Sequence, residues 1–443
     1  MNADDRQLLP ADHPQRVELN DEVHARPPGL LATPLRVSYI ALRVPPSTRD
    51  DEIGLLRELA GMYSSEGPVA GSSHFSADLG PFRIRWEHHT EFARYMLIAD
   101  GAEKTLFGEP AILRAPGDWI AGLPGQTVVA THVSMLPAPA AEPDYDEIAN
   151  RDFAGNPLMG AAVAGGAGIA LTDLRIHPDG FGRMLVLDRG MTSRQAGRIV
   201  QRLLEIDTYR MMALMALPVA RELSPFLYKS EAELAEITSA LTSAEAEDES
   251  KLLDRLTRLQ AALENRAADN NYRFGAATAY YDLVQRRIRE LREERLQGLQ
   301  TFREFTERRL APATNTCEAV SRRQESLSKR MARATRLLST RVDIERTEQN
   351  QALLASMNRR AAMQIRLQTT VEGFSVAAIT YYLVGLINYL AKSAEAMGFA
   401  VNASLVTAAS IPLVAVGVAL GIKSVRRMVS KSPASRVSGA GPD

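Results

Sequence analysis

Residues 373–391 read GFSVAAITYYLVGLINYLA and residues 396–422 read AMGFAVNASLVTAASIPLVAVGVALGI, and neither stretch contains a charged side chain. A helix of roughly 20 residues crosses the hydrocarbon core of a bilayer, and these stretches have 19 and 27. Lys392–Glu395 carries the only charges between them, which leaves room for a tight turn. The sequence therefore predicts two transmembrane helices within residues 371–424. Two buried core helices of a soluble protein are the alternative.

The flanking charges predict the orientation of this membrane hairpin. Three arginines between residues 359 and 366 precede it, and it is followed by Lys423, Arg426, Arg427, Lys431 and Arg436. Lys and Arg are enriched on cytoplasmic flanks, so both termini are expected in the cytoplasm. Residues 1–10 lack the basic and apolar segments of a signal peptide. One cysteine, Cys317, agrees with a reducing compartment.

Residues 1–190 are predicted to form an α+β cytoplasmic domain. Runs of β-branched and aromatic residues between turn signals indicate strands at 35–44, 75–78, 82–88, 92–99, 127–136, 167–176 and 184–187. A helix is expected at 47–64, with turns at 80–81 and 177–180. Several antiparallel strands with a few helices favour this class over a doubly wound parallel sheet.

Residues 191–370 are predicted to form a helical coiled-coil stalk, and residues 425–443 a short basic cytoplasmic tail. The first stalk helix is expected from Thr192 or Ser193 to about Leu217, where Pro218 would kink it. Apolar residues then recur with the 3–4 spacing of a coiled coil, and Gln324 fills one polar position. This apolar row consists of Val320, Leu327, Met331, Ala334 and Leu338.

The apolar row must be buried against a partner. Residues 284–310 can fold back onto it, with a reversal at 311–313, because proline disfavours helix in the residue before it. Leu337, Val342 and Leu354 would then face a second subunit. Alternatively, another copy covers the row directly. Both arrangements predict a homo-oligomer held through the stalk.

The first candidate site is the string NDEVHARPP at residues 20–28. Side chains alternate along an extended chain, so Glu22, His24 and Arg26 would share one face. They could bind an anion or transfer protons. A buried ion-paired network is the favoured alternative.

The second candidate is WEHHTE at residues 86–91, where Glu87, His88 and His89 are possible metal ligands. Neighbouring residues on a strand point to opposite faces, so a metal would need a further partner such as His74. A structural role is favoured, no metal is predicted, and the sequence indicates no particular cofactor or small-molecule ligand.

Other patterns carry no chemistry. Gly160, Gly165, Gly166 and Gly168 lack the spacing of a phosphate loop and predict a flexible link into a strand. Cys317 has no recognisable partner, and no nucleophile elbow is present. The net charge is −1, and the stalk has 20 basic against 11 acidic residues between 273 and 366 without aromatic platforms. Nucleic acid is therefore not an expected partner, whereas the lipid bilayer is.

Within the membrane helices, Asn388 and Asn402 are expected to bond to backbone or to a partner helix. Gly417 and Gly421 form a GxxxG step, which permits close helix contact within the hairpin or between copies.

Four strings together resemble the bacterial membrane-anchored family catalogued as domain of unknown function 3422. They are LNDEVHARPP (19–28), PFRIRWEHHTEF (81–92), QRLLEIDTYRMMAL (201–214) and VEGFSVAAITYYLVGL (371–386). The resemblance spans essentially the whole chain. It implies a bacterial inner-membrane protein with a large cytoplasmic part, and it implies no activity.

The order of parts is also similar to that of CorA-type magnesium channels. Their Gly-Met-Asn triplet is missing, because the corresponding place is Gly385-Leu386-Ile387-Asn388-Tyr389. Three functions therefore stay open. The leading hypothesis is a self-associating, non-enzymatic binding or scaffold protein, followed by a divergent divalent-cation channel and by a membrane-anchored enzyme that uses the Glu22/His24/Arg26 region.

Overall fold

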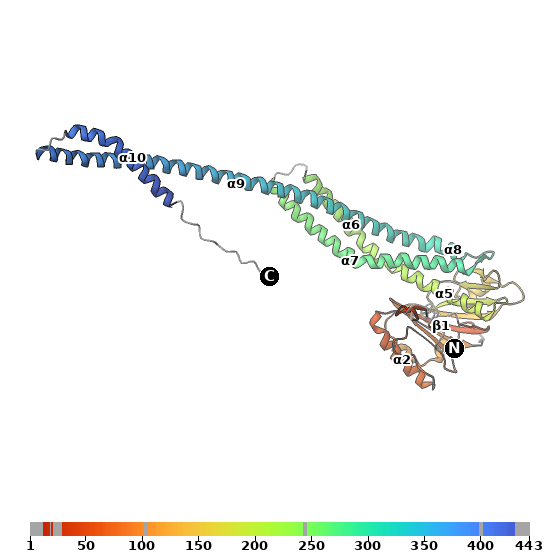
Figure 1. Cartoon of the computed structure of the whole chain (residues 1–443). Coiled ribbons are helices and arrows are strands. Elements are labelled where there is room, and N and C mark those ends of the chain that lie inside the picture. The colour runs from red at the N-terminus through yellow and green to blue at the C-terminus, as the bar shows by residue number, and fades with distance from the viewer. Residues whose placement is uncertain are drawn as a thin grey trace. The chain divides into compact units, whose positions relative to one another are not determined.

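The computed structural model describes residues 12–17, 19–20, 29–101, 105–241, 246–397 and 402–429, which form two compact units, residues 1–336 and 337–443 (Figure 1). Nine strands form one sheet: β1 (Leu35–Arg43), β2 (His74–Asp78), β3 (Arg83–His88), β4 (Phe92–Asp100), β5 (Gln126–Pro137), β6 (Met159–Val163), β7 (Gly168–Thr172), β8 (Gly182–Asp188) and β9 (Glu294–Arg295). The α-helices are α2 (Arg49–Met62), α3 (Gly117–Ala121), α4 (Tyr145–Asp152), α5 (Ser193–Leu214), α6 (Ala216–Ala240), α7 (Ala246–Leu291), α8 (Phe302–Phe305), α9 (Ala311–Ala396) and α10 (Ala403–Val429). Short 3₁₀ turns occur at Pro46–Thr48 and Ala111–Arg114.

The sheet is mixed, with the strand order β2-β3-β4-β1-β5-β8-β7-β6-β9. The predicted meander β2–β3–β4 and its antiparallel pairing are confirmed. One pair departs from the antiparallel expectation, since β5 and β8 run parallel. The parallel pairing arises from the chain between the two strands. This chain forms α4 and the hairpin β6–β7, and β8 then runs beside β5 in the same direction.

The glycine-rich segment, predicted to be a flexible link into a strand, is a loop only in part. Gly160 lies in β6 and Gly168 in β7, and only the turn between these strands contains Gly165 and Gly166, with φ of 68° and 83°. A Cβ on Gly160 would lie 2.5 Å from the carbonyl oxygen of Ala170. The glycine therefore permits close pairing of two strands. The predicted strand 167–176 accordingly ends at Thr172.

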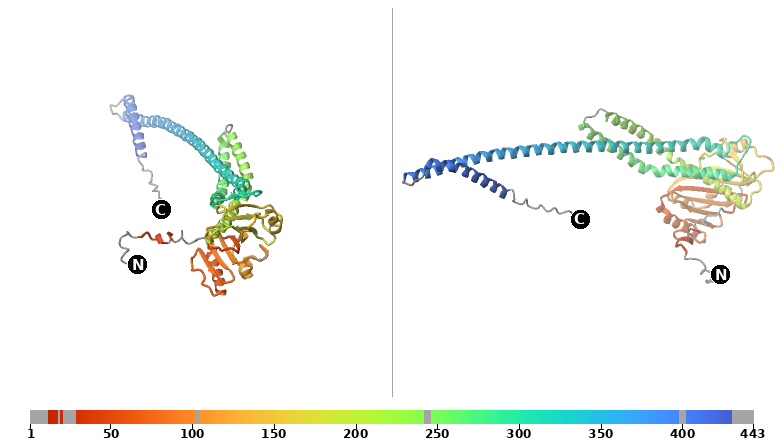
Figure 2. Two further views of the ribbon diagram at one scale, coloured as in Figure 1. Left: turned by 90° about the vertical axis from the view of Figure 1, so that its right-hand side faces the viewer. Right: turned by 45° about the horizontal axis from the view of Figure 1, so that its top comes forward.

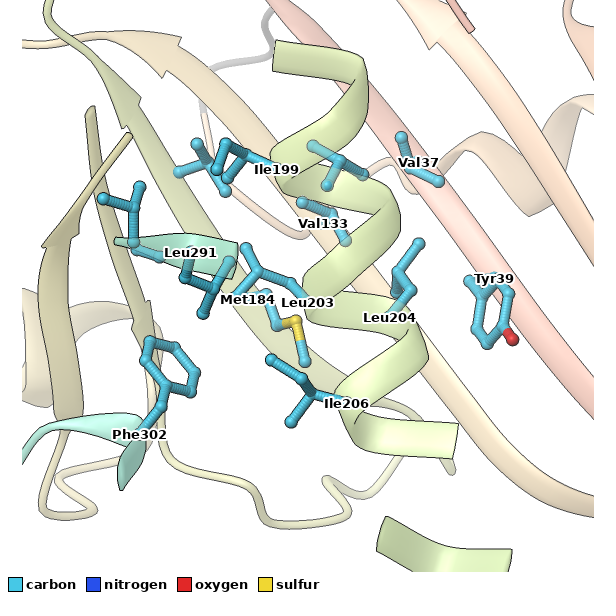
Figure 3. Close-up of a cluster of buried hydrophobic side chains, with 14 of the residues drawn as sticks. Val37, Tyr39, Val133, Met184, Ile199, Leu203, Leu204, Ile206, Leu291 and Phe302 are labelled. Atoms are coloured by element: carbon cyan, nitrogen blue, oxygen red, sulfur yellow. The ribbon is translucent and has the colours of Figure 1, made fainter. Parts of the chain in front are cut away.

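Alternation along the strands gives the sheet two buried faces. On β1, Val37 and Tyr39 belong to the core under α5, whereas Ile40 and Leu42 belong to the core under α2. Figure 3 shows Leu203 and other apolar residues of α5 among side chains of the sheet. The labelled set is Val37, Tyr39, Val133, Met184, Ile199, Leu203, Leu204, Ile206, Leu291 and Phe302.

Helix α5 begins as the sequence predicts. The Thr192 side chain accepts from the backbone N–H of Gln195, and the Gln195 side chain bonds back to the Thr192 N–H, which forms a capping box. The break comes at Met215 and precedes the expected kink at Pro218. Proline is tolerated within the first turn of a helix, where its missing N–H has no intrahelical partner.

Helices α6 and α7 lie side by side (Figure 2), and the first part of α9 packs on both. Thr335 of α9 donates to Gln260 of α7 at 2.9 Å, and Ser328 donates to Glu264. Between these two contacts the residue number falls along α9 and rises along α7, so the two helices are antiparallel. Arg323 of α9 makes a paired hydrogen bond with Glu231 of α6.

The predicted reversal at residues 311–313 is wrong. The chain turns at 292–301, where Arg292 and Gly298 have positive φ, and Pro312 stands in the first turn of α9. A π-helical turn at Thr306–Leu310 leads into α9. Val342 was expected to be free for a second subunit, but it is buried at 6% exposure.

Among the described residues, two helices are long and apolar enough to cross a membrane: the one that ends at Ala396, and Ala403–Val425. Asn388 of α9 accepts a hydrogen bond from the Thr407 hydroxyl of α10 at 3.1 Å. Gly417 and Gly421 have nothing within 4 Å of the Cβ position among the described residues, so neither makes a close helix contact within this chain.

Candidate functional site

A buried carboxylate–imidazole pair lies where α2 meets β3. Glu52 lies in the first turn of α2 and is one turn before Leu56 on the inward face. Trp86 and His88 are two residues apart on β3, so both point toward α2. The Trp86 Nε1–H donates to Glu52 Oε2 at 2.6 Å, and His88 Nδ1 lies 3.2 Å from Glu52 Oε1. The carboxylate therefore fixes the orientation of the imidazole ring.

A cavity of about 590 Å³ opens beside this pair. Its volume lies within the range of about 300–1,000 Å³ typical of small-molecule sites. Its walls come from the start of α2, the loop before β2, the β3–β4 turn, α5 and α7. The lining residues are Pro46, Arg49, Gly71, Ser73, His88, His89, Thr90, Phe92, Tyr209, Tyr280 and Leu283.

The carboxylate-bound histidine and an arginine of the lining each have a buried nitrogen atom that lacks a hydrogen-bond partner. These atoms are Nε2 of His88, whose side chain is only 1% exposed, and Nε of Arg49. Within the described ranges, no carboxylate forms an ion pair with the Arg49 guanidinium. Buried polar groups are nearly always paired with protein or with bound water. These two side chains are therefore available to a ligand.

Three aromatic rings form one wall of the cavity. Tyr209 of α5 and Tyr280 of α7 are stacked, with ring centroids 5.7 Å apart and an interplanar angle of 27°. The centroid of the Phe92 ring lies 6.4 Å from the centroid of each tyrosine ring. Burial raises the pKa of both tyrosines, and the nearby carboxylates Glu205 and Glu91 raise it further, so both hydroxyls stay neutral. This wall suits a flat apolar group.

An ion-pair network fixes the cavity walls to one another. Arg94 of β4 donates to Glu87 of β3 at 2.5 Å and to Glu205 of α5 at 3.2 Å. Arg287 of α7 also donates to Glu205. Burial lowers the pKa of Arg94, but the carboxylates, Glu87 foremost, outweigh this effect and the net shift is upward.

Further polar contacts hold α5 and α7 in register with the sheet. Asp207 accepts from Thr131 of β5 at 2.8 Å, and Thr208 bonds with Tyr39 of β1 at 2.8 Å. Arg273 of α7 donates twice to Glu91 in the β3–β4 turn, at 2.9 and 3.2 Å.

The residues predicted from sequence fall in different places. Glu22, His24 and Arg26 lie outside the described residues. Glu87 belongs to the ion-pair network, on the opposite face of β3 from His88. His89 stacks on Phe92 with ring centroids 4.5 Å apart, and its Nε2 is 3.7 Å from Glu87.

A metal centre is not formed by these groups. His74 pairs with Glu87 across β2 and β3 and does not line the cavity beside His88. No set of three or more His, Cys, Asp or Glu side chains suited to a metal occurs in the parts of the chain that the structure describes. Cys317 is buried, and burial raises the pKa of its thiol.

Sequence reasoning missed Glu52, Arg49 and Tyr280. Glu52 carried a signal, because it shares the apolar face of α2 with Leu56 and Leu59, and an acid at such a position indicates a buried partner. The sequence holds no such signal for Arg49 or Tyr280, because their meeting at one cavity depends on how α7 packs on the sheet domain.

A mixed-sheet domain followed by long helices, with a final apolar helix able to cross a membrane, defines the class of this protein. The chain belongs to the family described as Protein of unknown function (DUF3422), whose model matches residues 11–429. The resemblance drawn from the four strings is thereby confirmed. No curated protein matches the chain, and no solved structure does.

Proposed function

We propose that this chain is a self-associating binding protein anchored in the bacterial inner membrane, with both termini in the cytoplasm and no catalytic activity. The two apolar helices support the anchor, and the basic flanks support the orientation. The cavity beside His88 supports a binding role for the sheet domain. The observation that carries self-association is an uncovered apolar face on α9.

This α9 face consists of Leu337, Ile344, Leu354 and Ile365, which are spaced by 7, 10 and 11 residues. These intervals are sums of 3 and 4, so the four side chains follow the seam of a left-handed coiled coil. All four are more than half exposed, at 56–69%. Charged residues such as Arg341 and Asp343 surround them, which places this part of α9 in water and not in lipid.

A second copy of the chain is the proposed occupant of the α9 face. The face continues the helix that already buries Val320, Leu327, Met331 and Leu338, so packed helices are the established environment of this element. Burying one such side chain stabilises by about 1.5–3 kcal/mol. Eight from two copies give about 12 kcal/mol or more, which is comparable to an association cost of about 4–15 kcal/mol. Membrane anchors lower that cost further, because they hold the copies parallel in one plane.

Disulfide crosslinking in native membranes tests this proposal with the full chain. Leu354→Cys places a thiol on the α9 face, and Ser356→Cys places one on the opposite side of the same turn. Cys317 is buried, so the unmodified chain gives the background. Oxidation is expected to convert the Leu354→Cys protein into a covalent dimer, whereas the Ser356→Cys protein is expected to run as a single, uncrosslinked chain under denaturing conditions. Equal crosslinking of both variants, or of neither, contradicts the proposed face.

Leu338 is not the right position for such a test. It is fully buried, so Leu338→Asp disrupts packing within one chain. Leu354 is exposed, and its replacement leaves the fold of one chain intact.

A further inference from the structure

We infer that the cavity beside His88 binds a small aromatic carboxylic acid, whose carboxylate meets Arg49 and whose ring lies against Tyr209 and Tyr280. This inference adds a ligand class to the proposed binding role and is independent of self-association. It rests on three features of the cavity: its unpartnered polar groups, its charge and its aromatic wall.

The polar groups form a built site. Glu52 holds His88 through Nδ1, and such a hydrogen bond to a carboxylate fixes the orientation of an imidazole ring. Because Nδ1 donates to this carboxylate, Nε2 is left, buried and without a partner, to accept a hydrogen bond from bound water or from a donor group of a ligand. Arg49 is the first residue of α2, and the N-terminus of a helix adds a partial positive charge. A carboxylate is the group that a guanidinium binds with two parallel hydrogen bonds.

The charge balance around the cavity favours an anion. The acids that approach it are each engaged: Glu91 binds Arg273, Glu87 binds Arg94, and Glu52 accepts from Trp86 and bonds with His88. Asp50 and Asp51, on the same helix as Arg49, are exposed to solvent. The Arg49 guanidinium is the cation of the lining that no acid of the described chain neutralises.

The aromatic wall selects the rest of the ligand. The wall consists of the rings of Tyr209, Tyr280 and Phe92, whose centroids lie 5.7–6.4 Å from one another. Aromatic groups pack on such walls in offset or edge-to-face geometry. Arg49 and these rings line the same cavity of about 590 Å³, so a ligand that carries both a flat ring and a carboxylate can meet both.

Three probes of closely matched structure test the inference on the detergent-solubilised full-length protein by isothermal titration calorimetry. Phenylacetate carries both features, phenylacetamide has nearly the same shape without the charge, and acetate has the charge without the ring. We expect phenylacetate to bind about tenfold or more tightly than either, because a charge-assisted hydrogen bond contributes that factor. If phenylacetamide binds as tightly as phenylacetate, the site does not select an anion. If acetate binds as tightly, the site does not select an aromatic ring. Failure of all three to bind overturns the site, whereas the crosslinking result at Leu354 is unaffected.

A matched pair of variants locates the binding. Arg49→Gln removes a cation that has no partner among the described residues, so its melting temperature is expected to match that of the unmodified protein while phenylacetate affinity falls about tenfold. Arg43→Gln makes the same chemical change at an exposed position outside the cavity and is expected to leave affinity unchanged. Unaltered affinity in Arg49→Gln, or an equal loss in Arg43→Gln, places the anion elsewhere and refutes the assignment.

Discussion

Replacing Arg94 by methionine is expected to destabilise the sheet domain severely. Its side chain is 9% exposed and lies between Glu87, at 7%, and Glu205, at 4%. Glu205 keeps Arg287 and Gln201 as partners, whereas Glu87 keeps the more distant His89, at 3.7 Å, and Arg85, at 3.8 Å. The loss therefore arises mainly at Glu87. Removing one partner of a buried pair costs about 3–5 kcal/mol, out of a total stability of about 5–15 kcal/mol.

Urea denaturation followed by tryptophan fluorescence measures this loss in the full-length protein. The chain has two tryptophans, Trp86 and Trp119, and both are buried in the core under α2, so the signal reports on the sheet domain. The double variant Arg94→Met/Glu87→Leu is expected to recover most of the loss, because replacing a whole buried pair by apolar groups is often neutral.

An exposed ion pair serves as the control for Arg94. Arg258 pairs with Asp254 on α7, and its side chain is 79% exposed, so Arg258→Met is expected to change stability by about 0–1 kcal/mol. A loss below about 1 kcal/mol in Arg94→Met, or a double variant no more stable than the single one, refutes the assignment of the network as a buried, mutually dependent set.

Three further predictions follow from charge and burial. Burial lowers the pKa of His132 to about 4; Asp179 opposes this shift and Arg183 adds to it. The neutral ring therefore stabilises the fold fully above about pH 6.5. About 2–3 kcal/mol of the free energy of unfolding is lost as the pH falls to 4.5. His132→Gln should lack this step in urea midpoints compared at pH 7 and 4.5. A reporter active only in the periplasm, fused after Asp443, should be silent, and activity would overturn the orientation. Arg26→Ala should lower the melting temperature if residues 20–28 form a buried ion-paired network, and an unchanged value would favour a functional role instead.

The strands of the sheet were predictable where a local pattern carries the information. In three segments, apolar residues alternate with polar ones or form a continuous run between turn residues, and each segment forms a strand close to the expected bounds. These segments are 35–44, 82–88 and 92–99. The parallel pairing of β5 with β8 was not predictable, because it depends on the path of the intervening chain. The reversal after α7 was misplaced for a related reason. Pro312 is a helix breaker in the interior of a helix but is tolerated in its first turn.

The candidate site was predictable only in part. His88 was identified as a titratable residue on a strand, and the strand period correctly separates it from Glu87. Its partner Glu52 is 36 positions away, and Tyr280 approaches the same cavity from 192 positions further along the chain. Contacts at such separations are set by tertiary packing, on which local patterns are silent.

The mass of the detergent-solubilised full-length protein, corrected for bound detergent by light scattering, tests self-association most directly. One chain has a mass of 48.5 kDa, and we predict the mass of two or more chains, which persists on dilution to micromolar concentration. A mass of 48.5 kDa under the same conditions would contradict self-association through α9 and would remove the cation-channel alternative as well, leaving an anchored monomer.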